Sequence, residues 1–170
     1  MNINKKKENF VQNLKEFLII YKQIISSTEY SARERKNCGN QARDTAEAFS
    51  KLVIGEYIGE TGKGKANLYG MILQLKKGKY NFNTYTKRNV IDRLHRVRIV
   101  GNNASHNTQY KSSIYDIEEL KNNLLFLSTI LLGKEETQEI EKEIFEVKKS
   151  LHFSFFLPVL LLSYSFYLFK

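Results

Sequence analysis

Apolar residues recur every three or four positions through the first third of the chain. Residues at these intervals share one face of an α-helix, so two amphipathic helices are predicted, over residues 5–28 and 32–55. The positions that form the two stripes are Phe10, Leu14, Phe17, Leu18, Tyr21, Ile25, Ala42, Ala46, Phe49 and Val53.

The same spacing continues further along the chain. It predicts a short helix at residues 68–75, a helix that begins at Thr84 as its N-cap, and a helix from Ser113 that ends at Gly133. Glycine-rich residues 59–65 are predicted to form a loop, and they lack the spacing of a phosphate-binding loop. No segment alternates as a strand does. The predicted fold is therefore an all-α bundle of four main helices.

The pattern divides the chain into three parts. The bundle is expected over residues 5–133, and a charged linker helix over residues 134–150. Residues 151–169 form a hydrophobic tail without Asp, Glu, Lys or Arg, which would span roughly 28 Å as a helix. Lysines precede this tail, so it is expected to anchor the bundle to the inner, cytoplasmic face of a membrane. A core or interface helix is the alternative.

Charge is unevenly distributed along the 170 residues. The net charge is +9, and residues 1–112 hold 21 Lys and Arg against 9 Asp and Glu. This excess favours a polyanionic partner, although it also fits a solvated surface. The single Cys38 cannot form an internal disulfide, and no cysteine–histidine cluster offers metal ligands. We therefore expect a reducing compartment, no metal and no cofactor.

The stretch RVRIVGNNASH, residues 96–106, carries the candidate chemistry. If it is helical, Arg98, Asn102 and His106 stand on one face as a polar row that can grip a phosphate. Gly101 costs about 1 kcal/mol relative to alanine in a helix, unless close packing or a ligand needs the missing side chain. The alternative is that the helix ends at this glycine and leaves His106 in a loop.

This stretch resembles the Arg-x-x-Gly-Asn-x-Ala-Ala/Ser-His signature of a prokaryotic domain family found in restriction and defence proteins. That family belongs to the HEPN superfamily. The upstream ARDTAEAFSK, with Arg43 four residues before Glu47, is similar to the family's second helix. The resemblance, over residues 10–132, implies a four-helix bundle that forms a homodimer, acts in a defence or toxin–antitoxin setting, and has an antitoxin or defence-system partner.

Many HEPN members are metal-independent ribonucleases that use an arginine followed, after four to six residues, by a histidine. His106 matches the histidine of that motif and Asn102 its polar residue. The usual arginine position holds Gly101, however, and Arg98 lies further upstream. If this site is catalytic, His106 would transfer protons near neutral pH while Arg98 stabilises charge on phosphorus. Arg43 and Glu47 would support it.

Two roles for this supporting pair stay open. Glu47 and Arg43 form a surface ion pair one helical turn apart, or Glu47 holds Arg98 from the facing helix. The polar residues Asp92, Arg93, His95 and Arg96 are interpreted as a solvated face. A basic groove lined by Lys87, Arg88, Arg93 and Arg96 is expected to bind nucleic acid.

The leading functional hypothesis is an RNA- or nucleotide-binding domain, with metal-independent endoribonuclease activity as its candidate chemistry. The alternative is a catalytically silent interaction and dimerisation module of a defence or restriction system, in which the Gly-Asn-Asn stretch serves helix packing.

Overall fold

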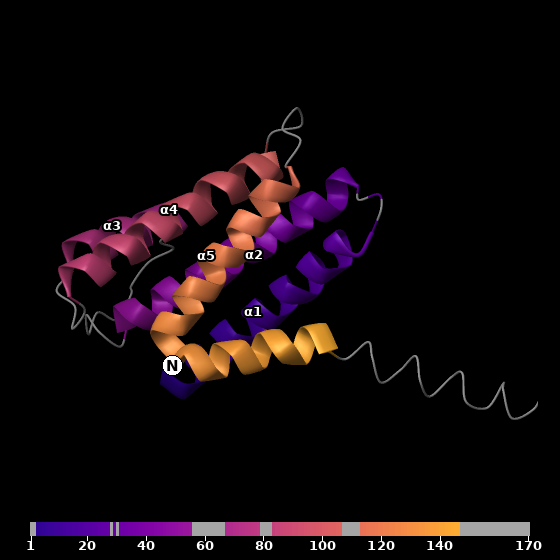
Figure 1. Cartoon of the computed structure of the whole chain (residues 1–170). Coiled ribbons are helices and arrows are strands. Elements are labelled where there is room, and N and C mark those ends of the chain that lie inside the picture. The colour runs from indigo at the N-terminus through magenta and orange to yellow at the C-terminus, as the bar shows by residue number, and fades with distance from the viewer. Residues whose placement is uncertain are drawn as a thin grey trace, which may run out of the picture.

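The computed structural model describes residues 3–27, 29, 31–55, 67–78, 83–106 and 113–146. Within these ranges the chain is helical and contains no strand, which confirms the all-α prediction (Figure 1). Residues 134–146 are also helical. The labelled helices are α1 (Ile3–Ile25), α2 (Ala32–Val53), α3 (Leu68–Lys77), α4 (Thr84–His106) and α5 (Ile114–Leu132).

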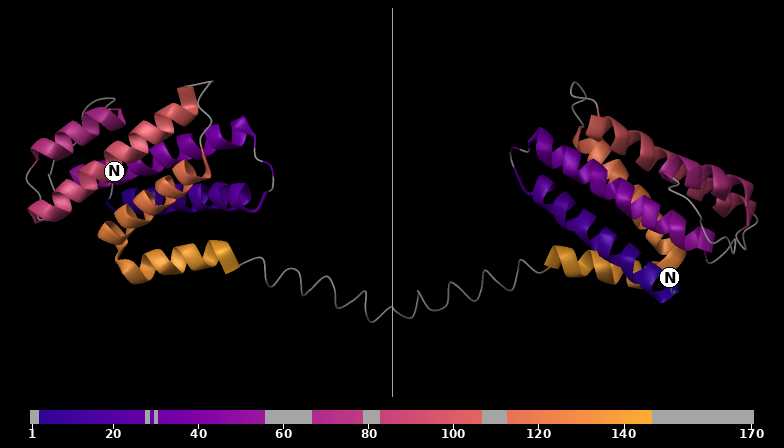
Figure 2. Two further views of the ribbon diagram at one scale, coloured as in Figure 1. Left: turned by 45° about the horizontal axis from the view of Figure 1, so that its top comes forward. Right: turned by 180° about the vertical axis from the view of Figure 1, so that it is seen from behind.

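The long helices pack side by side around a common core. Helix α2 lies between α1 and α4, α5 packs against α4 and α2, and α5 also contacts α1. The short α3 packs against α2 and α4 at the outer side of the bundle, as Figures 1 and 2 both show. Helix α4, which carries the candidate chemistry, therefore has α2, α3 and α5 as neighbours.

The predicted apolar stripes form the core, with one correction: Ile25 is 42% exposed, and its neighbour Ile24 is buried in its place. Phe10, Phe17, Phe49 and Leu94 are fully buried, and the rings of Phe10 and Phe49 meet edge to face at 6.0 Å. Full burial of such a side chain stabilises the fold by roughly 1.5–3 kcal/mol. The contact between these two rings joins α1 to α2.

Side-chain caps set the helix boundaries. Ser113 caps α5 in a capping box with Asp116, and Gly133 ends that helix with a positive φ of 88°, as predicted. The predicted cap at Thr84 is wrong by one residue. The Asn83 Oδ1 atom accepts a hydrogen bond of 2.8 Å from the backbone N–H of Thr86, so Asn83 caps α4.

The structure corrects the expected role of residues 134–150 as a linker helix, because residues 134–146 pack along α1 and α5 (Figure 2). Ile140 is only 6% exposed, and Thr137 is hydrogen-bonded to Ser128 of α5 at 2.9 Å. The helix also forms ion pairs across its edges: Lys7–Glu136 (3.1 Å), Lys15–Glu143 (2.7 Å) and Lys121–Glu141 (2.7 Å). The segment belongs to the bundle because its narrow apolar edge, formed by Ile140, Ile144 and Phe145, packs against the core.

Two predicted segments lie outside the described residues, namely the loop at residues 59–65 and the tail at residues 151–169. In the part of the chain that the structure describes, no helix is both long and apolar enough to cross a membrane.

Candidate functional site

Helix α4 continues without a break from Thr84 through the Gly-Asn-Asn stretch to His106. The alternative that the helix ends at Gly101 is therefore wrong, and the backbone places the polar row on one face. Arg98 and Asn102 are partly buried. The side chain of His106 lies outside the part of the chain that the structure describes.

Gly101 lies at a close crossing of α4 and α2. A Cβ atom added to it would stand 2.9 Å from the backbone oxygen of Gly39 and 2.7 Å from the Arg43 Cγ atom. A Cβ atom added to Gly39 would stand 2.6 Å from the Cβ of Ala104. Real Cβ atoms do not approach other atoms so closely, so the two glycines let the helix backbones meet.

The crossing brings two arginines from different helices into one region. The side chain of Arg43, from α2, passes over Gly101, and Arg98 lies one turn earlier on α4. The Nε atom of each is buried and has no hydrogen-bond partner among the described residues. A buried donor without a partner costs roughly 1–3 kcal/mol. The Asn123 Nδ2 atom is a third such donor, but only the arginine pair, Arg43 and Arg98, brings two of them from facing helices to one crossing.

Arg98 faces α3, where Tyr69 provides an aromatic surface. The guanidinium carbon of Arg98 lies 5.2 Å from the centroid of the Tyr69 ring, which is a cation–π distance. The ring of His95 lies beside the same tyrosine, with a centroid separation of 6.4 Å. Tyr69, His95 and Arg98 therefore form one cluster at the α3–α4 contact.

His95 is partly buried and does not belong to a fully solvated face. Burial lowers the pKa of His95, and the positive charges of Arg98 and Lys76 lower it further, while Asp92 opposes them. The spacing of His95 three residues before Arg98 is the signal in the sequence that could have joined them. No sequence signal singled out Tyr69, because its partners come from another helix.

The ion pairs expected for Glu47 do not occur among the described residues. The Glu47 carboxylate lies 3.7 Å from the Lys51 ammonium, one turn along α2. No ion pair joins it to Arg43 or Arg98 in the part of the chain described. Glu47, which was expected to support the site, is thus directed towards Lys51 of its own helix.

Arg93 and Arg96 face α5. Arg93 donates a hydrogen bond of 2.8 Å to the Oδ1 atom of Asn123, and its guanidinium lies 4.5 Å from the Phe126 ring centroid. The Arg96 Nε atom lies 3.2 Å from the Glu119 carboxylate. The structure therefore places both on the other flank of α4 from the arginine pair, and it does not bring them together with Arg98.

Lys87 and Arg88 lie in the first turns of α4. The Lys87 ammonium donates a hydrogen bond of 2.7 Å to the backbone oxygen of Gly78, at the end of α3. Arg88 is 85% exposed and reaches Asp92 only at 4.0 Å. The four basic residues expected to line one groove are therefore divided: Arg93 and Arg96 face α5, Lys87 reaches the end of α3, and Arg88 is exposed.

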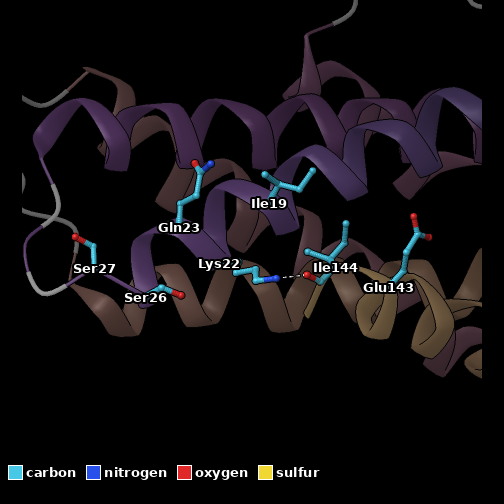
Figure 3. Close-up of a pocket in the computed structure, with 7 residues that line it drawn as sticks. All are labelled: Ile19, Lys22, Gln23, Ser26, Ser27, Glu143 and Ile144. Atoms are coloured by element: carbon cyan, nitrogen blue, oxygen red, sulfur yellow. Dashed lines mark hydrogen bonds between the residues drawn. The ribbon is translucent and has the colours of Figure 1, made fainter. Parts of the chain in front are cut away.

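A cavity of about 650 Å³ lies elsewhere, between the last turns of α1 and residues 134–146 (Figure 3). The Lys22 ammonium donates a hydrogen bond across it to the backbone oxygen of Ile144. None of the predicted site residues borders it. Its lining residues are Ile19, Lys22, Gln23, Ser26, Ser27, Glu143 and Ile144.

We found no match between the chain and any protein-family model, any curated protein or any solved structure. In the described ranges, His, Cys, Asp and Glu side chains do not gather in groups of three or more that could hold a metal ion.

Proposed function

We propose that the chain is an RNA- or nucleotide-binding helical bundle in which Arg43 and Arg98 hold a phosphate group. The observation that carries the proposal is the pair of buried, partnerless Nε donors beside the α2–α4 crossing. A phosphate oxygen would supply the missing acceptors. The relation to the HEPN superfamily is part of this proposal and rests on the signature from Arg98 to His106.

Phosphate fits the geometry of these donors. A guanidinium presents a planar fork of N–H groups that matches phosphate oxygens, and its hydrogen bonds to a charged acceptor are about twice as strong as neutral ones. Two arginines from two helices can grip one phosphate from both sides. The excess of basic residues in the first 112 positions would attract a polyanion to the bundle as a whole.

Metal-independent RNA cleavage is the second candidate function. It is favoured by the unbroken helix, which keeps Arg98, Asn102 and His106 in register. The close approach of Gly39 to Gly101 counts against it, because α2 fills the space that a motif arginine would need. In a nuclease assay with EDTA, cleavage that is lost in His106→Ala with RNA affinity retained would support the enzyme; no cleavage would favour the silent interaction module.

Homodimerisation, an antitoxin or defence-system partner, and membrane attachment through residues 151–169 belong to the same proposal. The tail is included because its length and lack of charge suit a bilayer. If the full-length chain stays in the soluble fraction of a cell lysate without detergent, the membrane part of the proposal is refuted.

The arginine pair can be tested by RNA binding at two salt concentrations. Because contacts to phosphate release counterions, affinity should fall steeply as salt rises. Arg98→Ala should weaken binding by about 10- to 100-fold, the value of one charged hydrogen-bonding group. Arg88→Ala is the matched control, since it removes the same charge from the exposed side of α4. Equal affinities of the two variants would refute the proposed phosphate site.

A further inference from the structure

We propose that Tyr69 is a stacking surface for an unpaired nucleobase beside the phosphate held by Arg43 and Arg98, so that the site selects single-stranded RNA over duplex. This inference rests on the proposed function and deepens it. It assigns the class of ligand that the arginine pair and its aromatic neighbour would take together.

Tyr69 belongs to a helix that is anchored to the core, and it is open to a ligand. It stands in the first turn of α3, which Asn67 caps, and that helix is anchored by buried Leu68 and Ile72. Tyr69 itself is 48% exposed. Exposed aromatic residues on a fixed helix offer flat area for a base with little loss of side-chain freedom.

The neighbours of Tyr69 match the two halves of a nucleotide. The Arg98 guanidinium carbon lies 5.2 Å from the centroid of the Tyr69 ring, and the Arg98 Nε atom lacks a hydrogen-bond partner. Arg98 therefore contacts the proposed base surface and also supplies one of the proposed phosphate donors. The His95 ring supports the tyrosine from α4 at 6.4 Å. A base on Tyr69 and its own phosphate on the arginine pair would thus occupy adjoining positions.

Duplex RNA would not satisfy this arrangement. Bases in a duplex are stacked on one another, and proteins that stack a base on an aromatic ring take it from a single strand, a loop or an end. A protein partner docked on Tyr69 and on Leu73, which is 38% exposed one turn further along α3, is the competing outcome. The partnerless donors beside the ring favour the nucleotide, because an apolar protein surface would leave them unpaired.

The test measures the affinity of the full-length chain for single-stranded and duplex RNA of equal length by fluorescence anisotropy. The single strand should bind more tightly. Tyr69→Ala should weaken its binding by about 5- to 150-fold, the usual range for loss of one stacked base, and Tyr69→Phe should retain it. Tyr85→Ala is the matched control, because Tyr85 is 78% exposed at the start of α4 and away from the arginine pair.

The outcomes separate this inference from the proposed function. Single-stranded binding that depends on Arg98 but is unchanged in Tyr69→Ala would overturn stacking and leave the phosphate site standing. Absence of any RNA binding would overturn both. A change in sedimentation in Tyr69→Ala with unchanged RNA affinity would identify a protein contact surface and also overturn the inference. The Tm of each variant is compared with that of the parent chain, so that a loss of RNA affinity can be distinguished from unfolding of the variant.

Discussion

Replacing Gly101 with alanine adds one methyl group at the closest contact between α2 and α4. The new Cβ atom would stand 2.9 Å from the backbone oxygen of Gly39 and 2.7 Å and 3.0 Å from the Cγ and Cδ atoms of Arg43. The arginine side chain can move aside. The carbonyl oxygen belongs to the backbone of α2, so relief there requires the two helices to separate.

Two opposing terms set the size of the effect. Overpacking of a well-packed contact usually costs about 1–3 kcal/mol, while alanine in place of glycine within a helix gains about 1 kcal/mol. Because a backbone atom cannot rotate away, we expect an overpacking cost in the upper part of its range, about 2–3 kcal/mol. After subtraction of the gain from alanine, the free energy of unfolding should fall by about 1–2 kcal/mol. For a chain of this length that lowers the Tm by about 2–8 °C.

The assay is thermal and denaturant unfolding of Gly101→Ala beside a matched glycine variant. Gly55→Ala serves as the control, because an added Cβ there meets only the flexible end of Lys6. The control should be as stable as the parent chain or slightly more so. A Gly101→Ala chain that is also as stable as the parent would refute the close crossing and reopen position 101 as a surface that faces a ligand.

Three further predictions concern other parts of the fold. Ser113→Ala should destabilise the chain by about 1 kcal/mol in denaturant unfolding, because α5 loses its capping box; no change would contradict that role. Ile140→Ala should cost about 2–5 kcal/mol, and a loss below about 1 kcal/mol would show that residues 134–146 do not pack on the bundle. The folded pKa of His95 lies below its ordinary value of about 6.5, chiefly through burial, so the unfolded chain binds this proton more readily. Stability should therefore fall as pH drops through about 6.5, and Tm values at several pH values should show a weaker fall in His95→Gln.

Much of the fold could be predicted from the sequence, because local rules decide it. Apolar residues three and four positions apart identified the faces of α1, α2 and α5 that became the core, and Ser113 and Gly133 marked where α5 begins and ends. The one-residue error at Thr84 has a local cause too. Asn83, an equally good cap, stands directly before it, and the backbone geometry chose between them.

Other features depended on which helices became neighbours. A charged segment such as residues 134–146 suits a linker or an edge helix equally well. Its contacts with α1 and α5, which bury Ile140 and pair its glutamates with lysines, decided for the edge. Likewise, the basic residues of α4 lie on two different sides of the helix, and the sequence does not show which neighbour each side meets. Contacts with α5 engaged Arg93, while contacts with α3 placed His95 beside an aromatic ring.

The sequence by itself determined that the stretch around Gly101 is unusual, since a glycine in a helix interior is costly and two asparagines follow it directly. Whether that glycine serves a ligand or a neighbouring helix was decided only by the tertiary structure. Gly39 lies 62 positions earlier in the chain, and the α2–α4 crossing brings its backbone against Gly101. The physical reason is that a helix repeats every 3.6 residues and thus reveals its own faces, whereas the distance between two helices depends on what both carry at their point of contact.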